Sequence, residues 1–224
     1  MLCKLHIIQF MKEELSDLRK IYQKGEINFN ELKNPYNLFK IWFNKANEDK
    51  FVEEANAMVL STIGKDGYPK GRVVLLKKIG PDGFVFFSNY NSDKGISIEK
   101  NNKVSLLFFW PSQERQIIIK GNVRKTSSKL SDKYFSKRPF KSQISAILSN
   151  QSEIIDSYSK LKDDMELLMK EKRNKPLKRP KNWGGYIVKP FEFEFWQGRP
   201  DRLHQRVLFS FDKNKKWKFN ILSP

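Results

Sequence analysis

The segment Phe191–Trp196 constrains the fold most, because apolar and charged residues alternate strictly along it. It is written F-E-F-E-F-W. A period of two residues is typical of a β-strand that buries one face and exposes the other. Such a strand needs neighbouring strands, so residues near the end of the chain must join a sheet formed by earlier segments.

Other segments with strand-like patterns supply these neighbours. Gly64-Lys65-Asp66-Gly67 and Pro81-Asp82-Gly83 are typical of the short turns between antiparallel strands. Sequential strands with short turns predict a barrel or a meander, so the expected fold class is predominantly β, antiparallel, with flanking helices. The expected strands cover residues 57–63, 71–79, 84–88, 104–110, 116–125, 186–188, 191–196, 206–211 and 217–222.

Helical periodicity is confined to segments that flank these strands. Residues 11–24 predict an amphipathic helix that ends at Gly25. A second helix is expected to begin at Asn34-Pro35, an N-cap followed by proline. Further helices are expected at residues 93–101, 127–137, 140–149 and 153–172.

We expect a single domain over residues 11–224. Lys175–Pro180 is a basic, proline-containing linker, but it does not separate two domains, because the strands after it need partners from the strands before it. We interpret residues 1–10 as a disordered N-terminal extension, either a flexible tail or the product of an upstream translation start, since ordinary helical sequence begins at Met11.

The formal net charge of +18 favours an anionic partner, which could be a nucleic acid, a membrane surface or a phosphorylated small molecule. No apolar run approaches the roughly 20 residues that span a bilayer. The first ten residues also lack the small-residue cleavage site of a signal peptide. We therefore expect no membrane partner and no export by this route.

Cysteine and histidine are scarce. Cys3 is the only cysteine, which excludes an intrachain disulfide and a cysteine-based metal cluster, and predicts a location in the reducing cytoplasm. His6 and His204 are the only histidines, too few for a histidine-rich zinc site, so no metal is expected.

A basic cluster follows the alternating strand. Arg202, His204 and Arg206 are two residues apart, so an extended backbone would place them on one face of the sheet. Two guanidinium groups beside an imidazole repel one another unless an anionic or planar group lies among them. The alternative is a solvated basic edge strand, but such edges favour lysine, whereas several arginines with Trp196 favour a planar ligand that carries phosphate.

Small polar residues and a lysine lie where a strand gives way to a helix, and such a junction can surround a phosphate with hydroxyl and N–H groups. These residues are Ser88, Asn89, Ser92 and Lys94. The chain has no G-x-G-x-x-G or P-loop pattern, so the usual fingerprints of dinucleotide and nucleoside triphosphate sites are absent.

Tyr134, Arg138 and Ser142 recur every four residues. Pro139 predicts a break in the helix, so the three residues are expected to surround a turn. A phenol, a guanidinium and a hydroxyl together suit one phosphate group.

The segment Arg72–Lys77 is an apolar run between two cations, which lie on opposite faces of a strand by parity unless a bulge intervenes. It suits a buried strand whose ends reach anionic groups, or else an ordinary strand with charged ends. Side-chain amides at Gln116 and Gln151 can both donate and accept hydrogen bonds, as recognition of a heterocycle requires.

Taken together and in this order, the motifs along the chain resemble the pyridoxine/pyridoxamine 5'-phosphate oxidase family, FMN enzymes that make pyridoxal 5'-phosphate. The likeness extends from about Arg19 to Pro224, and its most specific part is F-W-Q-G-x-x-x-R-L-H-x-R at 195–206. The other motifs are L-R-K-I-Y at 18–22, N-A-M at 56–58, R-V-V-L-L-K at 72–77, S-L-L-F-F-W at 105–110, E-R-Q at 114–116, K-Y-F-S-K-R-P at 133–139, S-Q-I at 142–144, Q-S at 151–152 and W-G-G-Y at 183–186.

The resemblance implies a split β-barrel homodimer that binds FMN at the subunit interface. The residues that it implies for FMN are Arg72, Val73, Val74, Leu75, Leu76, Lys77, Phe87, Ser88, Lys94, Gln116, Gln151, Ser152, Trp196 and Arg206. Those that it implies for the substrate are Lys77, Tyr134, Arg138, Ser142, Arg202, Leu203 and His204, with Arg19 and Tyr22 closing over it.

The resemblance also implies that pyridoxine 5'-phosphate or pyridoxamine 5'-phosphate is oxidised to pyridoxal 5'-phosphate. A hydride would pass from C4' of the substrate to N5 of FMN, and O2 would reoxidise the flavin with release of hydrogen peroxide. Arg202 and His204 are the predicted catalytic residues, placed over the reacting carbon. His204 would either hydrogen-bond the substrate or assist a proton transfer.

Two positions depart from the family's pattern. Ser92-Asp93-Lys94 stands where the family usually has S-R-K, so Asp93 should weaken FMN binding unless it turns away or pairs with a neighbouring lysine. Ile221 stands where the family usually has arginine, which puts a local salt bridge or a secondary phosphate contact in doubt.

Two other functions stay open from the sequence. A split-barrel reductase would bind FMN but act on another substrate. A polyanion-binding module would use the high positive charge and bind nucleic acid in a strongly salt-dependent way. No RNP, zinc-finger or helix-turn-helix signature is present, so we expect no specific nucleic-acid partner.

Overall fold

In the computed structural model, residues 15, 18 and 20–224 are described. The expected extension at residues 1–10, with Cys3 and His6, and the predicted site residue Arg19 therefore lie outside the described part of the chain. The strands of that part form one antiparallel sheet in the order β2-β1-β5-β6-β7-β4-β3, and β8 pairs with both β7 and β9. The expected antiparallel β class with flanking helices is thus confirmed.

The strands are β1 Ala57–Ile63, β2 Pro69–Leu75, β3 Lys78–Gly80, β4 Gly83–Asn89, β5 Lys103–Trp110, β6 Arg115–Lys125, β7 Trp183–Gln197, β8 Gln205–Phe211 and β9 Trp217–Leu222. The helices are α1 Pro35–Glu48, α2 Asp93–Lys100, α3 Ser128–Ser136, α4 Phe140–Leu148 and α5 Tyr158–Lys172, with short 3-10 turns η1 Phe29–Glu31, η2 Pro111–Gln113 and η3 Pro200–Arg202. None of the described helices is long and apolar enough to cross a membrane.

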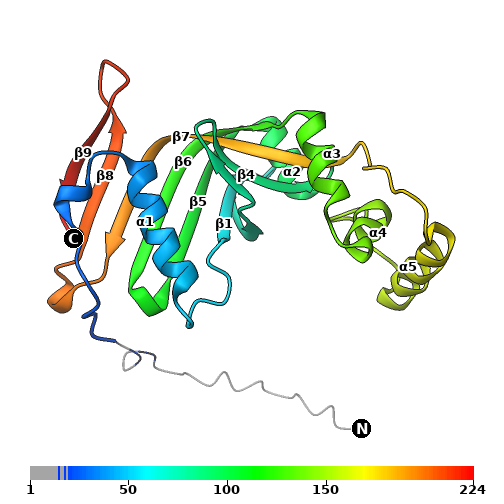
Figure 1. Ribbon diagram of the computed structural model, residues 1–224, viewed down its shortest axis with the longest axis horizontal. Helices are drawn as coiled ribbons and strands as arrows, with labels where there is room; N and C mark the ends of the chain where they lie inside the picture. The colour runs from blue at the N-terminus through cyan, green and yellow to red at the C-terminus, as the bar shows by residue number, and fades with distance from the viewer. Residues whose placement is uncertain (1–14, 16–17, 19) are drawn as a thin grey trace, which may run out of the picture.

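Strand β7 pairs with β4 through its first residues and with β8 through its last ones (Figure 1). Two strands were expected here, because Lys189 and Pro190 interrupt the alternating pattern. Pro190 pairs with Gly121 of β6, where the register shifts between Lys120 and Gly121. A proline cannot donate a hydrogen bond to the ladder, and a β-bulge of this kind accommodates it without ending the strand.

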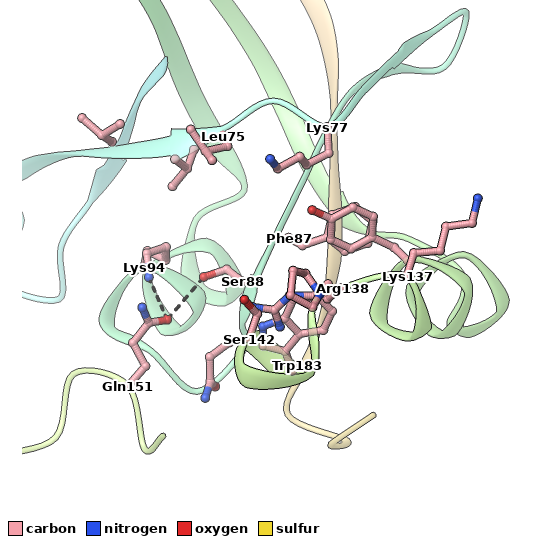
Figure 2. Close-up of a pocket in the computed structure, with 15 residues that line it drawn as sticks. Leu75, Lys77, Phe87, Ser88, Lys94, Lys137, Arg138, Ser142, Gln151 and Trp183 are labelled. Atoms are coloured by element: carbon pink, nitrogen blue, oxygen red, sulfur yellow. Dashed lines mark hydrogen bonds between the residues drawn. The ribbon is translucent and has the colours of Figure 1, made fainter. Parts of the chain in front are cut away.

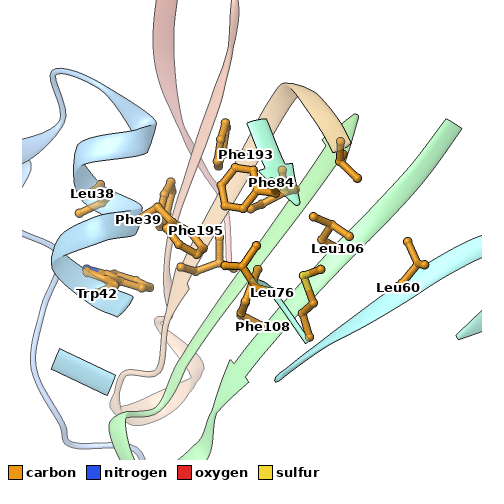
Figure 3. Close-up of a cluster of buried hydrophobic side chains, with 14 of the residues drawn as sticks. Leu38, Phe39, Trp42, Leu60, Leu76, Phe84, Leu106, Phe108, Phe193 and Phe195 are labelled. Carbon is orange, nitrogen blue, oxygen red and sulfur yellow. The ribbon is translucent and has the colours of Figure 1, made fainter. Parts of the chain in front are cut away.

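The core forms where α1 packs across one face of the sheet (Figures 1 and 3). Asn34 caps the helix, since its side chain accepts a hydrogen bond from the N–H of Tyr36. The buried ring of Phe39 meets Phe84 and Phe108 edge-on, at centroid distances of 4.9 and 5.1 Å. Aromatic pairs of this geometry add stability beyond the area they bury.

The opposite face of the sheet carries a row of apolar side chains that are only partly buried. By register, Val73 of β2, Val59 of β1, Leu107 of β5 and Ile118 of β6 lie side by side. Val73 is 65% exposed, and Phe109 on the same face is 52% exposed. Helix α1 covers the other face, so this row is available to a second layer.

Other expected elements also differ in extent, and the expected helix 153–172 begins only at Tyr158. Residues 20–24 are not helical, because the N–H groups of Gln23 and Lys24 donate to the Glu114 side chain rather than to carbonyl groups one turn earlier. The expected strand 71–79 divides at Leu76 and Lys77. Leu76 N–H donates to Asn56, before β1, whereas Lys77 N–H donates to Val85 of β4, so the chain changes partner strands there.

Candidate active site

A cavity of about 570 Å³ lies between the end of β2, strand β4, helix α2 and the turn between α3 and α4 (Figure 2). Its lining includes four basic residues and no aspartate or glutamate. Such a lining favours an anionic ligand. The lining residues are Val73, Val74, Leu75, Lys77, Phe87, Ser88, Asn89, Lys94, Tyr134, Lys137, Arg138, Pro139, Ser142, Gln151 and Trp183.

Lys94 is a buried cation held by neutral groups. Ser92 caps helix α2, and its Oγ accepts a hydrogen bond from Lys94 Nζ at 3.1 Å. The other acceptor is Gln151 Oε1, at 3.2 Å, which also lies 3.4 Å from Ser88 Oγ. The pKa of Lys94 is lowered to about 8, mainly by burial and also by the nearby Arg72, while Asp93 opposes the change. An anion in the cavity would complete this cluster.

Arg138 offers an unused hydrogen-bond donor at the other side of the cavity. Its guanidinium lies 4.6 Å from the centroid of the Trp183 ring, and its buried Nη1 has no hydrogen-bond partner among the described residues. Burial lowers the pKa of Arg138. A buried donor without a partner is costly, and a phosphate oxygen would satisfy it with a charge-assisted bond.

The turn between α3 and α4 brings Tyr134, Arg138 and Ser142 to the same cavity. Helix α3 ends at Ser136 and α4 begins after Pro139, so the expected break is confirmed. The ring of Tyr134 stacks on Phe87 at 3.8 Å, and Phe87 stacks on Trp183 at 5.7 Å. The hydroxyls of Tyr134 and Ser142 and the Arg138 guanidinium therefore lie beside a row of stacked aromatic rings.

Sequence reasoning missed Trp183 and Lys137 as lining residues. Trp183 begins β7 and pairs with Asn89 at the end of β4, which places it beside the cavity. The W-G-G-Y motif at 183–186 contains this residue, but the motif alone does not indicate a role for it. Lys137 follows α3 directly and faces the same space.

A second cluster lies at the far end of β7, around Trp196. His204 and Tyr22 contact its ring, at centroid distances of 4.8 and 5.6 Å, and are 5.6 Å from each other. His204 Nδ1 accepts a hydrogen bond from the N–H of Arg199 at 3.1 Å. The neutral imidazole therefore carries its proton on Nε2, which can donate to a ligand.

Gln116, Trp196 and Arg206 are direct neighbours across β6, β7 and β8. Arg206 also forms an ion pair with Glu194 at 2.8 Å. The expectation that Arg202 joins this face by parity is wrong. Asp201 and Arg202 both have positive φ, 56° and 61°, and β8 begins only at Gln205, so the backbone at Arg202 is a tight turn rather than a strand.

The two clusters are far apart in one chain. Trp196 lies thirteen residues beyond Trp183 on the same strand, and at about 3.3 Å per residue the separation is roughly 40 Å. Val73, Val74, Leu75, Lys77, Phe87, Ser88, Lys94, Tyr134, Arg138, Ser142 and Gln151 line the cavity, whereas Tyr22, Gln116, Trp196, Arg202, Leu203, His204 and Arg206 belong to the far end.

Three predicted residues lie beside the cavity without lining it. Arg72 Nη1 donates to the Leu60 carbonyl and to Thr62 Oγ1, at 3.0 and 2.8 Å. Leu76 is buried in the core. Ser152 Oγ accepts from the N–H of Asp93 at 3.2 Å. Which ligand each predicted residue holds stays a prediction.

Comparison with known proteins identifies relatives over almost the whole chain. Residues 45–168 match the family model described as pyridoxamine 5'-phosphate oxidase, and residues 183–224 match the pyridoxine 5'-phosphate oxidase C-terminal dimerisation region. A Flavobacterium johnsoniae protein named pyridoxine/pyridoxamine 5'-phosphate oxidase is 49% identical over 94% of this chain and 99% of its own length. A Legionella pneumophila protein of the same name is 45% identical, over 94% and 97%.

Solved structures with this fold include PhzG from Burkholderia lata, in complex with tetrahydrophenazine-1-carboxylic acid. It is 28% identical, with a TM-score of 0.82, and the match covers 90% of this chain and 100% of PhzG. An FMN-binding protein from Nostoc punctiforme, 13% identical with a TM-score of 0.68 over 85% of this chain and 98% of its own, shares the fold. The expected split-barrel architecture is confirmed, and the chain belongs to the pyridoxine/pyridoxamine 5'-phosphate oxidase family.

Proposed function

We propose that this protein is an FMN-dependent oxidase that converts pyridoxine 5'-phosphate and pyridoxamine 5'-phosphate to pyridoxal 5'-phosphate. Relatives at 45–49% identity bear the name of this activity. The structural observation that carries the proposal is the buried Arg138 Nη1, which has no hydrogen-bond partner in the described part of the chain and lies beside Tyr134 and Ser142. These groups suit the phosphate ester that both substrates share.

FMN is the cofactor of this flavoprotein. The cavity fits a flavin phosphate, because Lys94, Ser88 and the start of α2 offer donors without an acidic residue in the lining. We assign Arg72, Lys94 and Ser88 to the phosphate, and Val73–Leu75 and Gln151 to the ring system. When bound, FMN would supply the acceptor for a hydride from C4' of the substrate, with O2 as the final electron acceptor and hydrogen peroxide as its product.

The proposed site is shared between two subunits. One chain separates the two clusters by roughly 40 Å along β7, and the family model over residues 183–224 is named for dimerisation. In the dimer, Gln116, Trp196 and Arg206 of the partner subunit would complete the flavin site. The apolar row Val73–Val59–Leu107–Ile118 gives a second copy a surface to bury.

Arg202 and His204 are the proposed catalytic residues, and they would come from the same partner end. His204 Nε2 is free to donate, because Nδ1 is occupied by the N–H of Arg199. We assign it a hydrogen bond to the substrate rather than proton abstraction. The Arg202 guanidinium would hold the substrate ring flat against the flavin, so orientation supplies most of the rate.

The experiment is an anaerobic half-reaction with purified, FMN-loaded protein. Adding pyridoxine 5'-phosphate should bleach the visible flavin absorbance, and admitting air should restore it. Pyridoxine without phosphate is the matched control and should bleach the flavin far more slowly. A flavin that stays oxidised with both B6 phosphates would contradict the proposal and move the function to another flavin reaction.

A further inference from the structure

Residues 22–27 lie across the ends of β6, β7 and β8, and Glu114 holds them there. Glu114 precedes β6 and is 8% exposed. Its Oε2 accepts two hydrogen bonds, from the N–H of Gln23 at 2.8 Å and from the N–H of Lys24 at 2.7 Å. A carboxylate oxygen that binds two adjacent backbone N–H groups fixes the path of the chain between them.

Further bonds secure the same segment. The buried Gln197 Nε2 donates to the carbonyl of Lys24, and Arg199 Nη1 donates to the carbonyl of Gly25 at 2.8 Å. Gln205 Oε1 accepts from the N–H of Ile27 at 2.7 Å. These three residues lie at the end of β7, in the following loop and at the start of β8, so the segment is tied to the same turn that carries Arg202 and His204.

The anchored segment places Tyr22 against the far cluster. Its ring meets both Trp196 and His204 edge-on. A Cβ atom at Gly198 would lie 2.8 Å from Tyr22 Cγ and 3.0 Å from Glu114 Cβ. The tyrosine ring and the glutamate stem therefore share one space that only glycine leaves open.

Glu114 holds this position at a conformational cost. Its φ of 56° and ψ of 40° lie in the left-handed region, which is unfavourable for a residue with a Cβ. Its charged side chain is also removed from water. Glu114 is thus both strained and buried, and its side chain forms two hydrogen bonds to the segment that carries Tyr22. Because such costs are often found at functional sites, they point to a role of Glu114 in shaping the site.

We propose that Glu114 is a positioning residue for the B6 substrate, acting by fixing Gln23 and Lys24 so that Tyr22 stands beside His204. This inference rests on the proposed function, which assigns the Tyr22 and His204 end to the substrate. The FMN phosphate is assigned to the Lys94 cavity at the other end of β7, so loss of Glu114 should change flavin affinity less than the KM for the substrate.

The test compares Glu114→Ala with Glu114→Gln. Both backbone bonds end on one oxygen atom, so the amide carbonyl of glutamine can replace it, whereas alanine cannot. In Glu114→Ala, hydrogen exchange at the amides of Gln23 and Lys24 should speed up about tenfold or more. The KM for pyridoxine 5'-phosphate should rise about tenfold with a smaller change in kcat. Glu114→Gln should stay within about threefold of wild type in both measurements.

Glu166→Ala, which removes an exposed carboxylate on α5, is the control for loss of charge. Gly198→Ala keeps the Glu114 carboxylate but forces the Tyr22 ring to shift, so it should raise KM as well. It replaces Glu114→Ala if that variant does not fold. Faster amide exchange with unchanged KM would overturn the positioning role. Wild-type protein that never bleaches with substrate would instead remove the proposed function, and the exchange measurement would then still report the anchor alone.

Discussion

At the scale of single residues, the charge on Asp93 is balanced by a neighbour from another element. Asp93 begins α2 beside Lys94, and its Oδ2 lies 3.2 Å from Lys70 Nζ on β2. Both side chains are partly exposed, 44% for Lys70 and 41% for Asp93. Asp93 therefore pairs with a neighbouring lysine, which is one of the two ways the sequence leaves open for an acidic residue to be tolerated near the flavin phosphate.

Removing Lys70 alone should expose that acid to the bound phosphate. We expect Lys70→Ala to weaken FMN binding about three- to fivefold, since an exposed pair is worth up to about 1 kcal/mol. The double variant Lys70→Ala/Asp93→Asn should recover wild-type affinity, measured by quenching of flavin fluorescence in titrations of the apoprotein. Lys65→Ala, on the adjoining turn, is the control. Weak binding in the double variant would mean that Lys70 itself contacts the phosphate.

Lys94 makes flavin binding dependent on pH. Burial lowers its pKa from the usual 10.5 to about 8 in the free protein, so its ammonium is present at pH 7 and is lost as the pH rises above 8. A phosphate favours the charged form, and FMN affinity should therefore fall about tenfold between pH 7 and pH 9.5. Lys94→Arg should remove this dependence, because arginine stays charged. A pH profile for Lys94→Arg equal to that of wild type would contradict the assignment.

The sequence predicted local geometry well where one residue type imposes a fixed backbone conformation. Tyr134, Arg138 and Ser142 surround the turn that Pro139 imposes, as expected. Arg202 departs from its expected face because positive φ angles at two consecutive residues override strand parity. The pair Pro200-Asp201 is a turn signal, because aspartate tolerates positive φ, but Arg202 itself carries no such signal.

At the scale of elements, local pattern found most strands and helices, and long-range bonds explain the exceptions. Residues 20–24 have helical periodicity but form no helix, because the N–H groups of Gln23 and Lys24 donate to the Glu114 side chain. Glu114 lies 90 residues away in sequence from Lys24. Strand β7 stays continuous through Pro190 because Phe191 is an extra residue in the register and forms a β-bulge, so Pro190 still pairs with Gly121 of β6. In each case the partner, Glu114 for residues 20–24 and Gly121 for Pro190, lies on another element and is not visible in the segment itself.

Gly121, which lies opposite the bulge in β7, gives a stability prediction for this strand pair. A Cβ atom there would lie 2.6 Å from Val188 Cγ1 and 2.7 Å from the Lys189 carbonyl oxygen. Gly121→Ala should therefore lower the free energy of unfolding by about 1–3 kcal/mol, measured by urea denaturation. Gly80→Ala is the matched control, because its nearest neighbour is Lys78 Cε at 4.0 Å. Equal stability of the two variants would show that β6 and β7 yield freely at the bulge.

At the scale of the whole molecule, the separation of the two clusters decides how the site is assembled. The phosphate-binding groups near Arg138 and the proposed catalytic pair Arg202 and His204 lie at opposite ends of β7. The order of motifs in the sequence does not predict this distance. Two strands joined by a turn would bring Trp183 and Trp196 close together, whereas the single strand β7 holds them apart. In the proposed dimer, two copies in opposite orientation would bring the Arg138 end of one chain to the Arg202 end of the other.

Complementation between inactive variants tests this arrangement directly. Arg138→Ala and Arg202→Ala homodimers should each oxidise pyridoxine 5'-phosphate poorly, because every site lacks one group. When the two chains are co-expressed and pair at random, half of the dimers are mixed, and each mixed dimer has one site with both arginines and one site with neither. Activity should then recover to about a quarter of the wild-type value. If each chain built its own site, every site in every dimer would carry a substitution and mixing would restore nothing.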